Sequence, residues 1–98
     1  MAKAQSGVKE AAIERTLRRC VEALGGACIK VRAIGTRGFP DRLIALPGRR
    51  IMLVELKRPR GGRLSPHQRQ CHATFDALGV EIAIVRTIED IERLLSPH

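Results

Sequence analysis

Two acidic residues and one lysine have the types and spacing for metal-assisted chemistry. Asp41 opens an apolar run at 42–46, and Glu55 and Lys57 close a second apolar run at 51–57. Two carboxylates can hold one divalent cation, and a nearby ammonium can stabilise charge that develops on a phosphoryl group. This combination is the minimum equipment for cutting phosphodiester bonds.

Two strands joined by a turn must position these residues. The turn-like segment 47–50 separates the two apolar runs, so the pattern predicts a β-hairpin. Side chains alternate along a strand, so Glu55 and Lys57 should share one face of the second strand. Both faces of 51–57 are largely apolar, which predicts a central strand covered on both sides. A buried glutamate there is costly unless it pairs or holds a metal.

The rest of the chain shows helical and strand patterns around this hairpin. Ser6 is the expected N-cap of the first helix, and Gly79 is the expected stop of the second. The predicted elements are helices at 8–24, 66–78 and 87–95 and strands at 28–33, 42–46, 51–57 and 80–86. The order α-β-β-β-α-β-α predicts an α/β fold, and 98 residues predict one small domain spanning 1–98.

Positive charge is concentrated in the middle of the chain. The segment from Lys30 to Arg63 contains ten basic residues and only two acidic ones, Asp41 and Glu55, which gives it a net charge of +8. The rest of the chain contains eight basic and eight acidic residues, whose charges cancel. A concentrated basic field fits a polyanion such as a nucleic-acid backbone. Carboxylates inside it fit a surface that brings a cation to a phosphate, although pairing with neighbouring arginines is the alternative.

The candidate nucleic-acid contacts lie on either side of the predicted hairpin. The glycine-containing segment 35–39 should form a mobile loop, and 58–64 should form a second, basic loop. The residues expected to contact the backbone are Lys30, Arg32, Arg37, Arg42, Arg58, Arg60 and Arg63. Such contacts hold phosphates without reading base sequence.

Two further positions near the site allow two interpretations each. Glu10 and Glu14 lean toward the buried ridge of the first helix, so one could reach the metal; alternatively both stay on the rim and pair with Arg18. Gln68 follows Ser65 by three residues, which is the spacing of a capping box. That spacing gives Gln68 a plain structural role as the alternative to a role in the site.

Other classes of site have weak support in the sequence. A zinc site at His67, Cys71 and His72 lacks a second pair of soft ligands, so His72 is expected on the helix surface. We expect the three cysteines to be small core residues of a protein in a reducing compartment; they are Cys20, Cys28 and Cys71. There is no glycine-rich P-loop or dinucleotide fingerprint, so no organic cofactor is expected.

The sequence also lacks signals for membrane insertion or export. No apolar run approaches the roughly 20 residues that span a bilayer, and the N-terminus lacks the apolar stretch of a signal peptide. We therefore expect a cytoplasmic protein without a membrane partner.

Three motifs, at 38–42 (GFPDR), 54–58 (VELKR) and 64–68 (LSPHQ), resemble in this order those of the VRR-NUC family, part of the PD-(D/E)xK nuclease superfamily. The resemblance covers nearly the whole chain. It implies a nuclease core of order αβββαβ, with a central mixed sheet flanked by helices. It also implies a stand-alone member of the phage type, acting in the cytoplasm of a bacterial or phage-infected host.

The resemblance implies a role for each candidate residue. Asp41 and Glu55 would ligate Mg²⁺ or Mn²⁺, with the backbone carbonyl of Leu56 as a third ligand. Lys57 would position or deprotonate the attacking water.

On the same basis, Glu14, or less directly Glu10, matches the acidic residue of the family's first helix, where Glu14 would be a further ligand. Gln68 matches the glutamine that supports the site from the second helix. Two candidate glutamates leave this assignment open.

The expected function is that of a metal-dependent, structure-selective DNA endonuclease. Stand-alone relatives resemble junction resolvases, and two symmetric cuts in a four-way junction suit a homodimer. The main alternative is a non-catalytic basic nucleic-acid-binding module, which predicts metal-independent binding. A basic ribosome-associated protein is a third interpretation, and it predicts a preference for RNA.

Overall fold

The computed structural model describes residues 2–97, and it describes side chains from residue 10 onward. Its elements are α1 (Ala2–Ala23), β1 (Ala27–Lys30), β2 (Arg42–Leu46), β3 (Arg50–Leu56), α2 (Pro66–Ala77), β4 (Ile82–Val85) and α3 (Ile88–Leu95). The predicted order of helices and strands is confirmed. Within residues 2–97, none of the helices is both long and apolar enough to cross a membrane.

The four strands form one mixed sheet in the order β1-β2-β3-β4. The first three strands are antiparallel, and β4 runs parallel to β3. The predicted hairpin is present, with Arg42 opposite Val54 and Leu46 opposite Arg50. β3 is therefore an interior strand, and Glu55 lies near its C-terminal end.

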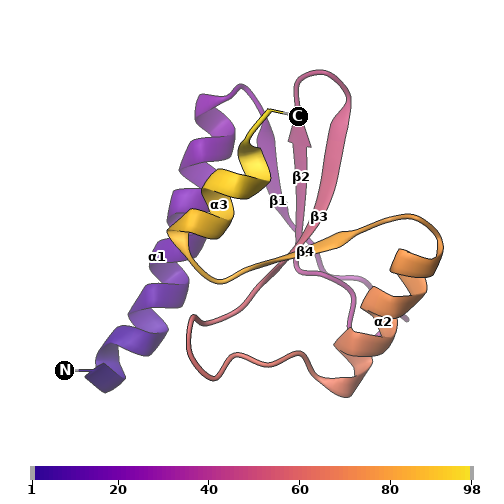
Figure 1. The fold of residues 1–98 in the computed structure, drawn as a ribbon, viewed down its shortest axis with the longest axis horizontal. Helices are drawn as coiled ribbons and strands as arrows, with labels where there is room; N and C mark the ends of the chain where they lie inside the picture. Colours follow the sequence, from indigo (N-terminus) through magenta and orange to yellow (C-terminus); the bar gives the residue numbers. More distant parts are fainter. Residues whose placement is uncertain (1, 98) are drawn as a thin grey trace.

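The main core lies between the sheet and two helices. α1 and α3 lie side by side over one face of the sheet, and α2 lies on its other side (Figure 1). Leu17 and Val21 of α1 and Ile91 of α3 are buried against Ile44 and Val54 of the sheet. Burying an aliphatic side chain of this size contributes about 1.5–3 kcal/mol, so this layer holds the site's strands in place.

The opposite face of the sheet is only partly covered. Ile29 is 51% exposed, Ile51 is 68% exposed and Ile84 is 36% exposed, and the strand registers place all three on the face that also carries Glu55. We call these three residues the open apolar face. The prediction that β3 is covered on both sides therefore holds only for its buried C-terminal residues, Val54 to Leu56.

Three predicted boundaries differ from the structure. α1 begins at Ala2 rather than after Ser6, because an alanine-rich segment can continue a helix through a residue that is also a good cap. β1 ends at Lys30, since the chain leaves the sheet after one further bond from Val31 to the carbonyl of Asp41. β4 begins at Ile82 because the Val80 amide bonds back to Phe75 and closes the end of α2.

Candidate active site

Asp41 and Glu55 are neighbours on adjacent strands. Asp41 directly precedes β2, and extending the hairpin register by one residue places it opposite Glu55, on the same face. The carboxylate Oδ1 of Asp41 accepts a hydrogen bond from the Leu56 amide at 3.2 Å. The two carboxylates predicted from the sequence are therefore brought together by a single pair of strands.

The carbonyl of Leu56 faces a residue that cannot donate to it. In the same register Leu56 lies opposite Pro40, which is buried and has no N–H group. The Leu56 amide donates its hydrogen bond to the side chain of Asp41 instead of to a backbone carbonyl of the neighbouring strand. The carbonyl is thus left without its ladder partner beside the two carboxylates, which is the position expected for a backbone ligand.

Glu55 is an unusual residue because it is a buried carboxylate. It is 2% exposed, and burial, with the negative charge of Asp41 as the second cause, raises its pKa to about 7. Its Oε2 accepts a hydrogen bond from the Gln68 side-chain amide at 3.0 Å, whereas Oε1 has no hydrogen-bond partner among the described residues. A buried carboxylate with an orphaned oxygen is suited to binding a cation.

Gln68 performs both of the roles that its position allowed. Its side-chain Oε1 accepts from the Ser65 backbone amide at 2.8 Å, and its backbone amide donates to the Ser65 hydroxyl at 3.1 Å, so the predicted capping box at the start of α2 is confirmed. Its Nε2 is thereby free to reach Glu55. The cap of α2 also fixes the side chain that contacts the buried carboxylate.

A hollow of about 370 Å³ gathers the predicted site residues. Its lining consists of Glu10, Asp41, Glu55, Leu56, Lys57, Arg58, Gly61, Gly62, Arg63 and Gln68. Lys57, the first residue after β3, is half-buried beside the carboxylates. One concave surface therefore combines acidic groups, an ammonium and arginines from four separate segments of the chain.

The two glutamates of α1 have different surroundings. Glu10 lines the hollow that contains Glu55. Glu14, one turn further along, lines an adjacent hollow together with Glu10, Asp41 and Leu56, and it lies 3.0 Å from Arg18 and 3.6 Å from Arg42. The pairing with Arg18 is therefore observed for Glu14, both glutamates line a hollow with Asp41, and Glu10 also lines the hollow that contains Glu55.

Arg42 points inward rather than toward a ligand. It is 8% exposed, donates to the Asp41 carbonyl at 2.9 Å, and lies 3.8 Å from the carboxylate of Asp41. Burial and these internal contacts leave it unable to contact a nucleic-acid backbone, contrary to the role expected from the sequence. Its charge instead lies between Glu14 of α1 and Asp41, which precedes β2.

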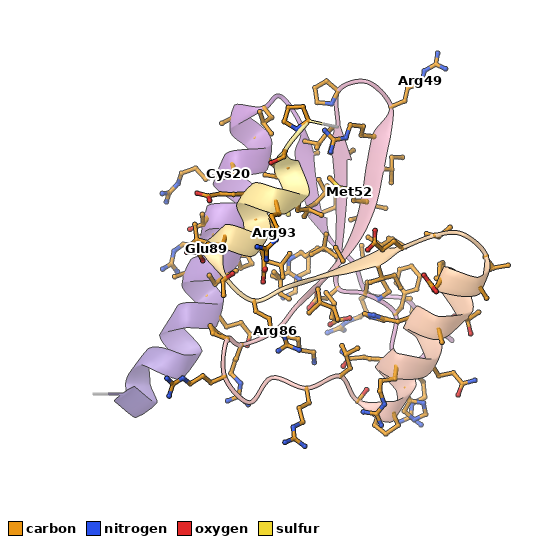
Figure 2. All side chains as sticks on the ribbon, in the orientation of Figure 1. Cys20, Arg49, Met52, Arg86, Glu89 and Arg93 are labelled. Atoms are coloured by element: carbon orange, nitrogen blue, oxygen red, sulfur yellow. The ribbon has the colours of Figure 1, made fainter. Side chains whose placement is uncertain are left out.

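The other six basic candidates are exposed on two segments, and the segment after β3 lines the hollow through Arg58 and Arg63. They are Lys30, Arg32 and Arg37 near the β1–β2 connection, and Arg58, Arg60 and Arg63 after β3. The segment after β3 crosses the molecule between the N-terminal half of α1 and α2 (Figure 1). Figure 2 shows Arg86 pointing toward this segment, where it bonds to the carbonyls of Arg58 and Gly62. Arg86 thus holds the basic loop in shape.

The glycine-containing loop at 35–39 is packed at one end rather than free. Gly38 has a φ of +79°, and a Cβ there would lie 2.3 Å from the carbonyl of His67. The ring of Phe39 meets that of Phe75 edge to face at 5.7 Å. The predicted mobile loop is therefore anchored on α2 immediately before Asp41.

Known proteins resemble this chain over most of its length. It is 40% identical over 88 residues to the protein named "Putative nuclease p44" of Acyrthosiphon pisum secondary endosymbiont phage 1, a match that covers 90% of this chain and 92% of that protein. A solved structure described as a VRR_NUC domain matches with a TM-score of 0.81 and 31% identity, over 89% of this chain and 94% of its own. The chain belongs to the VRR-NUC family. No family model matches the sequence.

Membership in the VRR-NUC family confirms the predicted fold and the general activity. The chain has the PD-(D/E)xK type of mixed sheet flanked by helices, and it is a nuclease, a hydrolase of phosphodiester bonds. Nucleases of this fold work with a divalent metal ion. A non-catalytic binding module or a ribosome-associated protein would not explain the similarity to a protein named as a nuclease and to a VRR_NUC domain.

The donor set of this VRR-NUC nuclease fits a hard divalent cation. Two carboxylates, one of them with an orphaned buried oxygen, lie beside a backbone carbonyl without a ladder donor. Among the described side chains, no three His, Cys, Asp or Glu residues are gathered as a metal site. Two side-chain ligands and one carbonyl agree with that finding.

Sequence reasoning missed one residue of this site. His72 was expected on the helix surface, but its side chain is only 14% exposed, and its Nε2 lies 3.7 Å from Oε1 of Glu55. Burial, and secondarily the charge of Lys57, lowers the pKa of His72, which favours the neutral ring. The signal that could have revealed it is its spacing, since four residues after Gln68 lies on the same helix face.

Proposed function

We propose that this VRR-NUC nuclease is a metal-dependent, structure-selective DNA endonuclease that resolves four-way junctions as a homodimer. The observation that carries the proposal is the convergence of Asp41 and Glu55 in one hollow with Lys57 and Gln68. On this proposal, residues 1–98 form one nuclease domain that acts in the cytoplasm of a bacterial or phage-infected cell.

Mg²⁺ or Mn²⁺ is the proposed cofactor. Asp41, Glu55 and the carbonyl of Leu56 would hold it, and Glu10 lies in the same hollow as a further acid. When bound, such a cation polarises a phosphoryl oxygen and lowers the pKa of a coordinated water. Burial and Asp41 raise the pKa of Glu55 in the metal-free protein, and a cation between the two carboxylates would favour its ionised form.

Lys57 is the proposed catalytic cation of the protein itself. It follows Glu55 by two residues at the end of β3, and its side chain lines the same hollow. An ammonium at this position can hold the attacking water and stabilise negative charge on the phosphoryl group during attack. The partial burial of Lys57 strengthens that interaction relative to one in bulk water.

DNA is the proposed substrate. Exposed Arg58 and Arg63 line the hollow, and exposed Lys30 lines the adjacent hollow with Asp41, which suits a backbone passing over the carboxylates. With Phe39 packed on Phe75, neither phenylalanine offers a free stacking platform for single strands. Recognition through phosphates favours the shape of branched DNA over its sequence.

The open apolar face supports self-association. Ile29, Ile51 and Ile84 expose isoleucine side chains on one face of the sheet, and exposed apolar surface is often covered at a protein interface. A two-fold symmetric homodimer would cover this face and present two identical sites to the two symmetric strands of a junction. Light scattering should give a dimeric mass for the wild type and a monomeric mass for Ile51→Glu. A monomeric wild type at working concentration would count heavily against both the dimer and the junction.

Cleavage of defined substrates tests the proposed activity. Wild type and Asp41→Asn would be incubated with end-labelled four-way junction, linear duplex and single strand, with Mg²⁺, Mn²⁺ or excess chelator. We expect paired symmetric nicks in the junction that disappear in the variant and in chelator, while the variant keeps or improves its affinity for DNA. Binding without cleavage by the wild type under every condition would contradict the proposal.

A further inference from the structure

His72 of α2 and Glu55 of β3 form an incomplete pair behind the candidate active site. The Nε2 atom of His72 and the Oε1 atom of Glu55 are both buried, both lack a hydrogen-bond partner among the described residues, and lie 3.7 Å apart. We propose that His72 is a positioning residue that donates its Nε2–H to Glu55 and fixes this carboxylate for metal binding. This inference rests on the proposed function of Asp41 and Glu55 as metal ligands.

The distance between the two atoms is close to that of a hydrogen bond. A bond between nitrogen and a carboxylate oxygen is about 2.7–3.2 Å long, so a movement of roughly 0.5–1 Å would complete it. Leaving either atom buried without a partner costs on the order of one broken hydrogen bond. Native proteins rarely leave two neighbouring buried polar atoms without hydrogen-bond partners. Each of these two atoms is the polar group that the other can reach.

The position of His72 on α2 completes a clamp on the carboxylate. Gln68 already donates to Oε2 of Glu55 at 3.0 Å, and His72 lies one turn further along the same helix, opposite Oε1. An ionised carboxylate has about four acceptor positions on two oxygens. One donor on each oxygen would leave the remaining positions for a cation in the hollow and would hold the carboxylate plane fixed.

The surroundings of His72 argue against a role as a metal ligand. His72 does not line the hollow that contains Asp41, Glu55 and Lys57, and its Nε2 faces Glu55 instead. Donors that hold the ligands of a metal, rather than the metal itself, usually affect its affinity because they fix ligand orientation. His72 is therefore placed to act on the metal only through Glu55.

Titration of Mn²⁺ into the 98-residue protein tests the inference by calorimetry. His72→Phe removes the donor and keeps a ring, so we expect it to weaken Mn²⁺ affinity about 10- to 100-fold. His72→Gln restores an N–H donor and should recover most of the loss. Gln70→Ala is the matched control, because Gln70 is exposed on the same helix, and it should bind Mn²⁺ like the wild type. Melting temperatures in chelator establish that each variant is folded.

Wild-type affinity in His72→Phe, or a His72→Gln variant as weak as His72→Phe, would overturn the inference. If His72→Phe does not fold, nitrogen-15 NMR of the wild-type ring decides instead, with and without Mg²⁺. The inference requires the tautomer protonated at Nε2, and a ring protonated only at Nδ1 would refute it. Failure of the proposed function is distinguishable, since the wild type would then show no Mn²⁺ binding that depends on Asp41.

Discussion

Gln68 and Glu55 are joined by a 3.0 Å hydrogen bond, and the same glutamine side chain closes the capping box of α2. Its oxygen accepts from the Ser65 amide while its nitrogen donates to the buried carboxylate. The start of a helix and the orientation of a proposed metal ligand therefore depend on one side chain. The Ser65 hydroxyl makes the other bond of the capping box, with the backbone amide of Gln68, so capping and the contact with Glu55 can be tested by separate mutations.

Ser65→Ala and Gln68→Ala should have different effects. Ser65→Ala removes the capping hydroxyl but leaves the amide of Gln68 on Glu55, so we expect a loss of about 1 kcal/mol in stability with cleavage largely retained. Gln68→Ala removes both bonds and should also lower the cleavage rate about 10- to 100-fold. Denaturant unfolding and single-turnover cleavage measure the two effects. Equal cleavage rates in the two variants would show that the contact with Glu55 is dispensable.

Lys57→Met should separate chemistry from metal binding. The methionine keeps an unbranched apolar side chain beside the carboxylates but removes the ammonium. We expect the cleavage rate at saturating metal to fall about 100- to 1,000-fold, because the charge that stabilises the phosphoryl group is lost. Mn²⁺ affinity should change little or increase, since a nearby positive charge has been removed. A variant that cleaves at the wild-type rate would exclude Lys57 from the chemistry.

Arg60→Gln and Arg49→Gln should differ in their effect on DNA affinity. Arg60 is exposed in the loop that borders the hollow, whereas Arg49 is exposed at the tip of the β2–β3 hairpin, pointing away from the rest of the molecule (Figure 2). Loss of one phosphate contact should weaken binding of every DNA substrate and lower the slope of log K against log salt by about 1. Fluorescence anisotropy over a salt series would show this for Arg60→Gln alone. An equal effect of Arg49→Gln would indicate nonspecific attraction by net charge.

The pKa of Glu55 predicts how the stability of the metal-free protein depends on pH. Burial and Asp41 raise that pKa from 4.5 to about 7, so the folded state binds this proton more tightly than the unfolded chain. The resulting stabilisation is complete below about pH 4.5 and is lost as the pH rises through 7. In chelator, the free energy of unfolding of the wild type should therefore fall, relative to Glu55→Gln, between pH 5 and pH 8.

The comparison with Glu55→Gln isolates this one group. Glutamine cannot ionise, while other titrating residues remain in both proteins, including His72, whose lowered pKa acts with the opposite sign. Unfolding in urea at several pH values provides the measurement. A difference between the two proteins that is constant across this interval would show that Glu55 titrates in its ordinary range.

The parts of the site that depend on local pattern could be predicted from the sequence. Alternating apolar runs and a turn determine the hairpin, and the hairpin alone places Asp41 opposite Glu55. The capping box of Ser65 and Gln68 also follows from spacing, because a cap depends on residues three positions apart.

The parts that depend on how elements dock could not be predicted in this way. Glu10 and Glu14 lie on one ridge of α1, and only the placement of the helix along the sheet brings Glu10 to the hollow and Glu14 to Arg42. Arg42 belongs to a basic segment in the sequence, yet alternation along β2 turns it inward. His72 was missed for the same reason, since only the packing of α2 on the sheet shows which residue it approaches.

A crystal of the protein soaked in Mn²⁺ would test the central claim most directly. Anomalous scattering locates manganese independently of any assumption about the ligands. We expect a peak about 2.0–2.3 Å from carboxylate oxygens of Asp41 and Glu55 and from the carbonyl of Leu56, and we expect it to be absent in Asp41→Asn. A peak elsewhere on the protein, or the same peak in the variant, would contradict the assignment of this hollow as the metal centre of the nuclease.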